Sequence, residues 1–398
     1  MIQTTKLSTI VTLTLLTALP LMSLNMFLPS LGVMATEFEV GYDTMAFVVS
    51  GYLAFTALLQ VLSGPVADRF GRRPVLLISL GLFATASIGC VLAKNFETFL
   101  LFRVIQGAVI TGATLSRAIV SDIAAPKQAA SILGYMGMVM SLAPILAPSL
   151  GGFLAEVVGW RANFWVYAAT GVGLWILVWA LLPETTETNA GKGTAFLRSY
   201  WELLKSIHFW AYTLIMAFSI GGFYVFISGI PLIAAQQLGM TQSQIGLGMG
   251  SITIGFLVGS FLSARLSKNR ELNTMIILGR GTATVGLLAC LVVLSGGYVT
   301  PLILFAGTIF VGLGNGLTMP SASTAVMFVR NDLAASASGL FGAVIVIFGA
   351  IFSACAGAIL QVHSTAVILV GLMLALAFAS LAISIWIAKR PVNVAKES

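Results

Sequence analysis

The feature that most constrains this chain is a series of apolar runs, each long enough to cross a lipid bilayer as a helix. About 20 apolar residues, rising about 1.5 Å each, span a hydrocarbon core of about 30 Å. Charged residues make up 8% of the chain and apolar residues 58%, so no water-soluble fold could bury its apolar surface. The predicted fold class is an all-α integral membrane protein with twelve transmembrane helices in two six-helix bundles. The predicted spans are 8–31, 44–63, 75–93, 96–118, 130–154, 162–182, 209–230, 243–263, 274–294, 301–322, 337–360 and 365–387.

The positions of the basic residues predict the orientation of these spans. Of the 20 Lys and Arg residues, sixteen fall on the side that holds both termini. Only Lys94 and Arg161 fall on the other side, and Arg103 and Arg280 lie within spans. Because cytoplasmic loops carry an excess of Lys and Arg, both termini are predicted to be cytoplasmic. The net charge of +7 follows from this topology, and no nucleic-acid partner is expected.

A single long polar connection follows the sixth span and predicts the domain organisation. The two halves on either side of it resemble each other faintly: FLPSL at 27–31 resembles GIPLI at 229–233, and ADRFGR at 67–72 resembles SARLSK at 263–268. Two parallel six-helix repeats are a known transporter construction, with the substrate site near the bilayer midplane. The predicted units are an N-terminal bundle at 1–182, a cytoplasmic linker with an amphipathic helix at 183–208, and a C-terminal bundle at 209–398.

Four short motifs carry a family resemblance. GPVADRFGRRP at 64–74, between the second and third spans, is similar to the signature of the major facilitator superfamily. LLFRVIQG at 100–107, APILAPSLGG at 143–152 and GWRANFW at 159–165 resemble motifs of the fourth span, of the fifth span in exporters, and of the turn into the sixth span. Together they resemble the twelve-span drug:proton antiporters of the Bcr/CflA type, which export bicyclomycin, chloramphenicol-type compounds and related molecules.

The resemblance implies a secondary transporter that exports small amphipathic organic compounds, antibiotics included, by proton-coupled alternating access. It further implies a bacterial inner-membrane location, a small-molecule substrate, the lipid bilayer as surroundings, a functional monomer and no cofactor beyond the proton gradient. One residue departs from the group. Where its first span commonly carries an acid this chain has Asn25, and an amide does not take up and release a proton. The alternative is a metabolite transporter or facilitator of the same fold, for a nucleoside, sugar or vitamin, not proton-coupled at this position.

The segment 64–74 is predicted to form a conformational latch on the cytoplasmic side. Gly64 would allow close helix approach and Gly71 a tight turn. The resemblance places Asp68 against the start of the eleventh span and the arginines near carboxylates such as Asp122. The alternative is that the arginines serve topology alone. The predicted latch residues are Gly64, Asp68, Arg69, Gly71, Arg72, Arg73, Arg117 and Asp122.

Polar residues at membrane depth are candidates for a substrate or coupling cavity. An ionisable side chain there is costly unless it faces a polar cavity, so Arg103 is a functional candidate, and Gln106 lies on the same helix face. The alternative for this pair is a structural hydrogen bond to backbone carbonyls near Pro144. Arg280 is predicted to extend its stem toward the inner surface. The predicted cavity residues are Asn25, Arg103, Gln106, Tyr224 and Asn315.

The fifth span contains a predicted helix-bending exporter motif, made of Pro144, Pro148, Gly151 and Gly152. Each proline frees a backbone carbonyl and each glycine thins the helix, so the span could bend or pack closely. The resemblance assigns this motif to sealing the cavity in exporters, and a kink that makes room for cargo is the alternative.

No sequence pattern predicts an enzyme or a metal site. The three cysteines lie far apart inside apolar runs, and no set of His, Cys, Asp or Glu has the spacing of metal ligands. The glycine clusters lack the strand and the lysine that nucleotide-binding loops require, so helix packing is their expected role.

Overall fold

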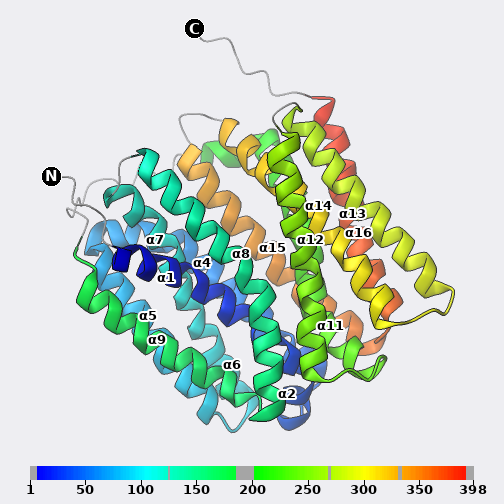
Figure 1. Ribbon diagram of the computed structural model, residues 1–398, viewed down its shortest axis with the longest axis horizontal. Coiled ribbons are helices and arrows are strands. Elements are labelled where there is room, and N and C mark those ends of the chain that lie inside the picture. The colour runs from blue at the N-terminus through cyan, green and yellow to red at the C-terminus, as the bar shows by residue number, and fades with distance from the viewer. Residues whose placement is uncertain (1–6, 124–125, 185–200, 268–269, 330–333, 391–398) are drawn as a thin grey trace.

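The computed structural model describes residues 7–123, 126–184, 201–267, 270–329 and 334–390 (Figure 1). Eleven helical segments among them are long and apolar enough to cross a membrane. The long helix α8 (Pro126–Val157) contains a further apolar stretch, Leu146–Val157. The predicted twelve-helix membrane fold is therefore confirmed.

Several spans are built from more than one helical element. The first six spans are α1 with η1 and α2 (Leu7–Asn25, Leu28–Ser30, Leu31–Glu37), α3 with α4 (Tyr42–Met45, Phe47–Phe70), α5 (Arg72–Leu92), α6 with η2 and α7 (Phe96–Ile105, Gln106–Val109, Ile110–Ile123), α8, and α9 (Arg161–Leu181). The last six are α11 (Ile207–Gln236), α12 (Gln242–Leu266), α13 (Leu272–Ser295), α14 (Pro301–Phe328), α15 (Ala334–Val362) and α16 (Ala366–Ala388).

The two ends of the bundle differ in charge, and we name them accordingly. The basic end is where α4 meets α5 and where α16 ends, and it carries Arg69, Arg72, Arg73, Arg265 and Arg390. The opposite end is where α2 and α11 end. Four helices that start at the opposite end have a side-chain N-cap, which satisfies backbone N–H groups of the first turn and so fixes where each helix begins. These caps are Asn95 for α6, Thr241 for α12, Thr300 for α14 and Thr365 for α16.

The segment 64–74, predicted to lie between the second and third spans, is mostly helix. Helix α4 runs to Phe70, α5 starts at Arg72, and only Gly71 separates them. Gly71 has φ +91°, a conformation that a residue with a Cβ rarely adopts, and this single residue reverses the chain. The close helix approach predicted for Gly64 stays a prediction, since a Cβ there would meet no described atom within 4 Å.

The fifth span is also more regular than predicted. Helix α8 continues without interruption past Pro144 and Pro148. Neighbouring helices in a membrane can accommodate the backbone groups that prolines free, and α1 and α12 both pack along α8.

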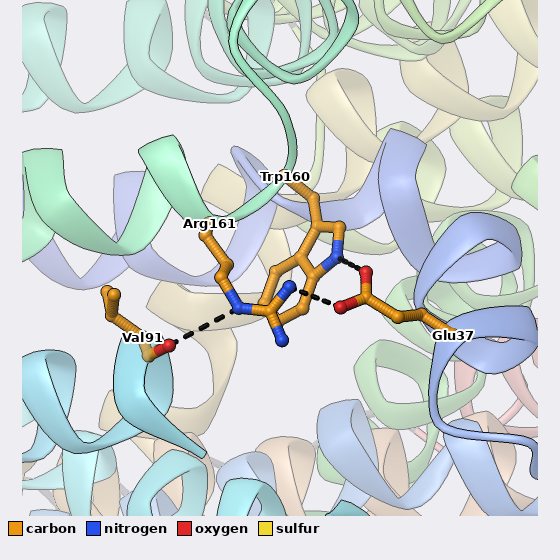
Figure 2. A network of polar contacts seen from close by, with 4 residues as sticks. All are labelled: Glu37, Val91, Trp160 and Arg161. Atoms are coloured by element: carbon orange, nitrogen blue, oxygen red, sulfur yellow. Dashed lines mark hydrogen bonds and ion pairs between the residues drawn. The ribbon is translucent and has the colours of Figure 1, made fainter. Parts of the chain in front are cut away.

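At the opposite end, a polar network fastens three of the first six spans together (Figure 2). The Trp160 indole N–H donates to Glu37 at 2.6 Å, and the Arg161 guanidinium pairs with the same carboxylate. Arg161 Nε also donates to the carbonyl of Val91 at 3.3 Å. The turn before α9 therefore holds the ends of α2 and α5, which explains the GWRANFW segment structurally.

The first six and the last six spans pack side by side, with α8 next to α12 (Figure 1) and α4 next to α15. Much of the predicted linker, 185–200, lies outside the described residues, so the division into two bundles stays a prediction. The described part of its amphipathic helix begins at Trp201, whose side chain is exposed.

Candidate functional site

A buried polar cluster lies around Arg103 within the first six spans. The guanidinium is fully buried. Its Nη1 donates to Gln106 Oε1 at 2.7 Å and to Ser23 Oγ at 3.1 Å, and its Nη2 donates to the Ser23 carbonyl at 2.8 Å. Gln106 extends this hydrogen-bond network to the third span, because its amide N–H donates to Ser87 Oγ at 2.7 Å. Spans one, three and four are thus joined through one charged group.

Two aromatic rings complete the surroundings of this guanidinium. The Arg103 Cζ lies 4.3 Å from the centre of the Phe27 ring and 4.1 Å from that of Tyr52. Cation–π contacts of this kind stabilise a desolvated charge. Arg103 therefore rests on neutral hydrogen-bond acceptors and rings, and its backbone carbonyl partner is Ser23 and not a carbonyl near Pro144.

Asn25 does not join this cluster. Its amide N–H donates to the carbonyl of Leu21, one turn back in its own helix, at 2.8 Å. It is the last residue of α1, where the first span breaks before Pro29. The structure therefore brings Arg103 and Gln106 together, as their i,i+3 spacing predicted. The residue of the first span that bonds to Arg103 is Ser23, which sequence reasoning did not select.

A second buried cluster lies around Arg280 within the last six spans. Its Nε donates to Thr318 Oγ1 at 2.9 Å, and its Nη2 donates to Asn315 Oδ1 at 2.8 Å. The same Asn315 oxygen accepts a hydrogen bond from Ser219 Oγ at 2.7 Å. Spans seven, nine and ten meet at this point.

The prediction that Arg280 snorkels to the inner surface was wrong, because its side chain is only 1% exposed. Arg280 lies eight residues after Leu272, or about 12 Å along α13. At this depth the guanidinium donates to two oxygen acceptors on α14. A second polar residue on the same α14 face, Thr318 three positions after Asn315, was the signal that could have indicated this pairing.

Tyr224 belongs to neither polar cluster. Its ring packs against Gly349 of α15 and beside Phe223. It also lies near Tyr52, whose ring contacts Arg103, and its cavity role stays a prediction.

Both interior arginines lie at least six positions from any described carboxylate along the chain. In the described ranges, each Asp and Glu is outside the helices or within three residues of a helix end. Arg103 and Arg280 thus carry two positive charges at depth and have neutral hydrogen-bond partners among the described residues. A charge in low dielectric acts strongly on any charged molecule near it.

The opposite end is closed by hydrogen bonds between the first and the last six spans. Ser30 Oγ donates to Gln242 Oε1 at 2.9 Å, and the Tyr42 N–H donates to Gln361 Oε1 at 2.8 Å. The Ser243 N–H donates to Glu156 at 3.1 Å. Sequence reasoning selected none of these residues, since such pairs are 87 to 319 positions apart.

The fifth-span glycines make this closure possible. A Cβ on Gly151 would overlap the Met26 carbonyl, and one on Gly152 would overlap the carbonyl of Gln242. Gly246 of α12 fits against the carbonyl of Pro148 in the same way. The motif thus lets the α8 backbone touch α12 and the turn that follows α1 directly. A cavity of about 660 Å³ lies beside this contact, and it is lined by Val33, Tyr42, Glu156, Gln236, Gln242 and Gln361.

At the basic end, the structure brings several predicted latch residues together. Arg72 forms an ion pair with Asp122 of α7. Glu184, which follows α9, accepts hydrogen bonds from the backbone N–H groups of Arg72 at 2.9 Å and Arg73 at 3.1 Å. Because these N–H groups form the start of α5, a carboxylate there is stabilised by the helix dipole. Sequence reasoning missed Glu184.

The other described latch residues bond to backbone carbonyls or contact an aromatic ring. The Arg73 guanidinium donates to the carbonyl of Trp179 at 2.6 Å, and Arg69 lies over the ring of its neighbour Phe70. Arg117 Nε donates to the carbonyl of Ala113 in its own helix at 3.3 Å. The side chain of Asp68 lies outside the described residues, so its contact with the eleventh span stays a prediction.

Comparison with known proteins places the chain in a family. The model of the Major Facilitator Superfamily matches residues 13–354. A protein described as an uncharacterized MFS-type transporter, YdgK of Bacillus subtilis strain 168, is 27% identical over 347 residues, which is 84% of this chain and 85% of that protein.

Two further relatives have names that refer to drugs. The chloramphenicol resistance protein of Pseudomonas aeruginosa is 28% identical over 67% of this chain and 63% of its own length. The multidrug transporter MdfA of Escherichia coli O157:H7 is 29% identical over 66% of this chain and 65% of its own length. The match thus spans just under two thirds of each of these two proteins.

A solved structure has the same fold. The D-xylose-proton symporter superimposes with a TM-score of 0.75 and 14% identity, over 94% of this chain and 96% of that one. At this identity the likeness concerns the fold alone.

Proposed function

This chain belongs to the Major Facilitator Superfamily, and we propose that it is a secondary transporter of the Bcr/CflA type that exports small amphipathic organic compounds, antibiotics included. The observation that carries the proposal is the seal at the opposite end, where the α8 glycines bring the first and the last six spans into backbone contact. The relatives named for chloramphenicol resistance and multidrug transport support the class of cargo.

The seal supports transport by alternating access. If Lys and Arg mark the cytoplasmic side, the opposite end faces outward, and the structure is closed to the outside. The 660 Å³ cavity then forms an outer vestibule beyond the seal. Breaking the Ser30–Gln242 and Tyr42–Gln361 hydrogen bonds would open the transporter outward. Both termini are cytoplasmic in this proposal, in a bacterial inner membrane.

One observation favours a second candidate, a metabolite transporter or facilitator without proton coupling at the first span. Asn25 stands where the group commonly has an acid, and its amide is bonded to its own helix. Carboxylates in the described structure lie at helix ends or between helices, where they are not at the bilayer midplane.

Export of antibiotics tests the proposal. We expect cells that lack their main efflux pumps to tolerate several-fold more of at least one compound, from a panel that includes chloramphenicol, when they produce this chain. Uptake into inverted vesicles should rise when a proton gradient is imposed. Transport of a panel compound that is indifferent to the gradient would favour the facilitator, and failure to export any of them would contradict the proposal.

Removing the charge of Asp122 tests the basic-end latch. We expect Asp122→Asn to slow export about threefold to tenfold, because a partly exposed ion pair contributes about 1 kcal/mol. The rate should be compared at equal protein level with Glu97→Gln, which removes an exposed carboxylate at the opposite end. Equal export by the wild type and Asp122→Asn would contradict a latch role for the Arg72–Asp122 pair.

A further inference from the structure

We propose that the interior site selects neutral or anionic cargo with an oxygen acceptor and disfavours cations, because Arg280 holds Asn315 with its amide N–H₂ group free for the cargo. The inference rests on the proposed transport function and adds the chemical class of cargo. It uses two observations, the orientation of the Asn315 amide and the unbalanced charge of the interior.

The first observation fixes which way the Asn315 amide points. A guanidinium can only donate hydrogen bonds, so the atom that faces Arg280 Nη2 at 2.8 Å must be the amide oxygen. Ser219 Oγ donates to the same oxygen. The oxygen is therefore occupied, and the N–H₂ group has no recorded partner in the described part of the chain. Arg280 acts here as a positioning residue, because it turns Asn315 into a hydrogen-bond donor.

Asn315 also lies at the depth expected for a substrate site. It is fourteen residues after Pro301, or about 21 Å along α14, close to the middle of a helix that crosses the membrane. Its side chain is 7% exposed, whereas that of Arg280 is 1% exposed. Asn315 is thus the more accessible residue of the pair, at the level where transporters built of two repeats bind substrate.

The second observation concerns charge. Arg103 and Arg280 each use only neutral acceptors and rings among the described residues. At an effective dielectric constant of about 20, one unit charge about 10 Å from a ligand charge changes affinity about tenfold. The interior should therefore repel a cation, accept a neutral molecule, and favour a carboxylate or another anionic oxygen group.

Three probes of one shape test the charge preference. The purified full chain, in lipid nanodiscs, is titrated calorimetrically with 4-nitrobenzamide, 4-nitrobenzoate and 4-nitrobenzamidinium, which end in planar groups of similar size. We expect the cation to bind at least about tenfold more weakly than the amide. Binding of the cation as tightly as the amide would overturn the inference, and so would failure of both the amide and the carboxylate to bind at millimolar concentration.

Two variants separate the charge of the cluster from its geometry. Asn315→Asp should form an ion pair with Arg280 and raise cation binding relative to the amide about tenfold, a gain that misfolding does not produce. Arg280→Lys keeps the charge but cannot hold Thr318 and Asn315 at once. We expect it to weaken binding of the amide about fivefold while cations stay disfavoured. If the cluster served helix packing alone, the ratio of cation affinity to amide affinity would be the same in the wild type and in both variants.

Arg265→Gln is the matched control. It removes one positive charge from the last six spans at the exposed basic end, so the ratio of cation to amide binding should not change. An equal shift in Arg265→Gln and Asn315→Asp would overturn the assignment to Asn315. Antibiotic export in cells is measured separately. Export without a charge preference in binding would refute only this inference. Charge-selective binding without export of any panel compound would refute only the proposed export.

Discussion

Replacing Arg103 with lysine is expected to reduce transport about thirtyfold, although the positive charge is kept. The guanidinium reaches Ser23 Oγ, the Ser23 carbonyl and Gln106 Oε1 at the same time and lies between two rings. A lysine ammonium has neither the planar shape nor the fork of donors for this arrangement. Leaving a buried acceptor without a donor costs about 2 kcal/mol, which corresponds to about thirtyfold if the cluster must be intact in the transport cycle.

The measurement compares initial transport rates at equal amounts of folded protein. The thermal midpoint of each purified variant is measured as well, because a loss of folding would lower both the transport rate and the thermal midpoint. Arg390→Lys is the matched control, since Arg390 is exposed at the basic end and lies over Trp386. If Arg103→Lys retained more than half of the wild-type rate, the cluster would not be part of the transport machinery.

Replacing Gly152 with valine is expected to shift the protein strongly toward the outward-open state. A side chain at this position would overlap the backbone of Gln242, which belongs to the other six spans. Overpacking costs about 1–3 kcal/mol, and a penalty confined to the closed state changes the population ratio by about 5- to 150-fold. Transport should fall, because the outer seal no longer closes.

Labelling of a cysteine at Ile245, which lines the cavity at the opposite end but is only 1% exposed while the seal is closed, reports this shift. The exposed Cys355 is replaced by serine, and the rate of reaction with a membrane-impermeant maleimide is measured. Gly152→Val should raise this rate. Gly173→Val is the control, because a Cβ at Gly173 would meet no described atom within 4 Å. Equal labelling rates in the two variants would show that the α8–α12 contact is not the outer seal.

The sequence predicted those parts of the site that depend on one helix. Arg103 and Gln106 are three positions apart, so they share a helix face whatever surrounds them, and they are bonded in the structure. Spacing along one helix does not show which residue of the first span lies beside Arg103. Sequence reasoning selected Asn25 as a cavity residue, whereas the structure places Ser23 there. Which of two nearby residues faces the fourth span depends on how α1 is rotated and where it breaks before Pro29, and that rotation is set by packing.

Contacts between distant helices were the part that sequence reasoning missed. The burial of Arg280 depends on where α14 places Asn315 and Thr318, and the role of Glu184 depends on where α9 ends relative to α5. Neither placement leaves a periodic pattern in the chain. The same holds for Ser30 and Gln242, which are 212 positions apart and meet at the seal.

The sequence by itself determined that the chain crosses a membrane twelve times, because the length and hydropathy of a span are local properties that the bilayer selects directly. It also predicted that Arg103 lies at membrane depth and shares a helix face with Gln106. Only the tertiary structure decided what Arg103 and Arg280 hold and which end of the bundle is sealed. These outcomes depend on the rotation and close approach of helices, which are fixed by side-chain and backbone packing across the whole molecule.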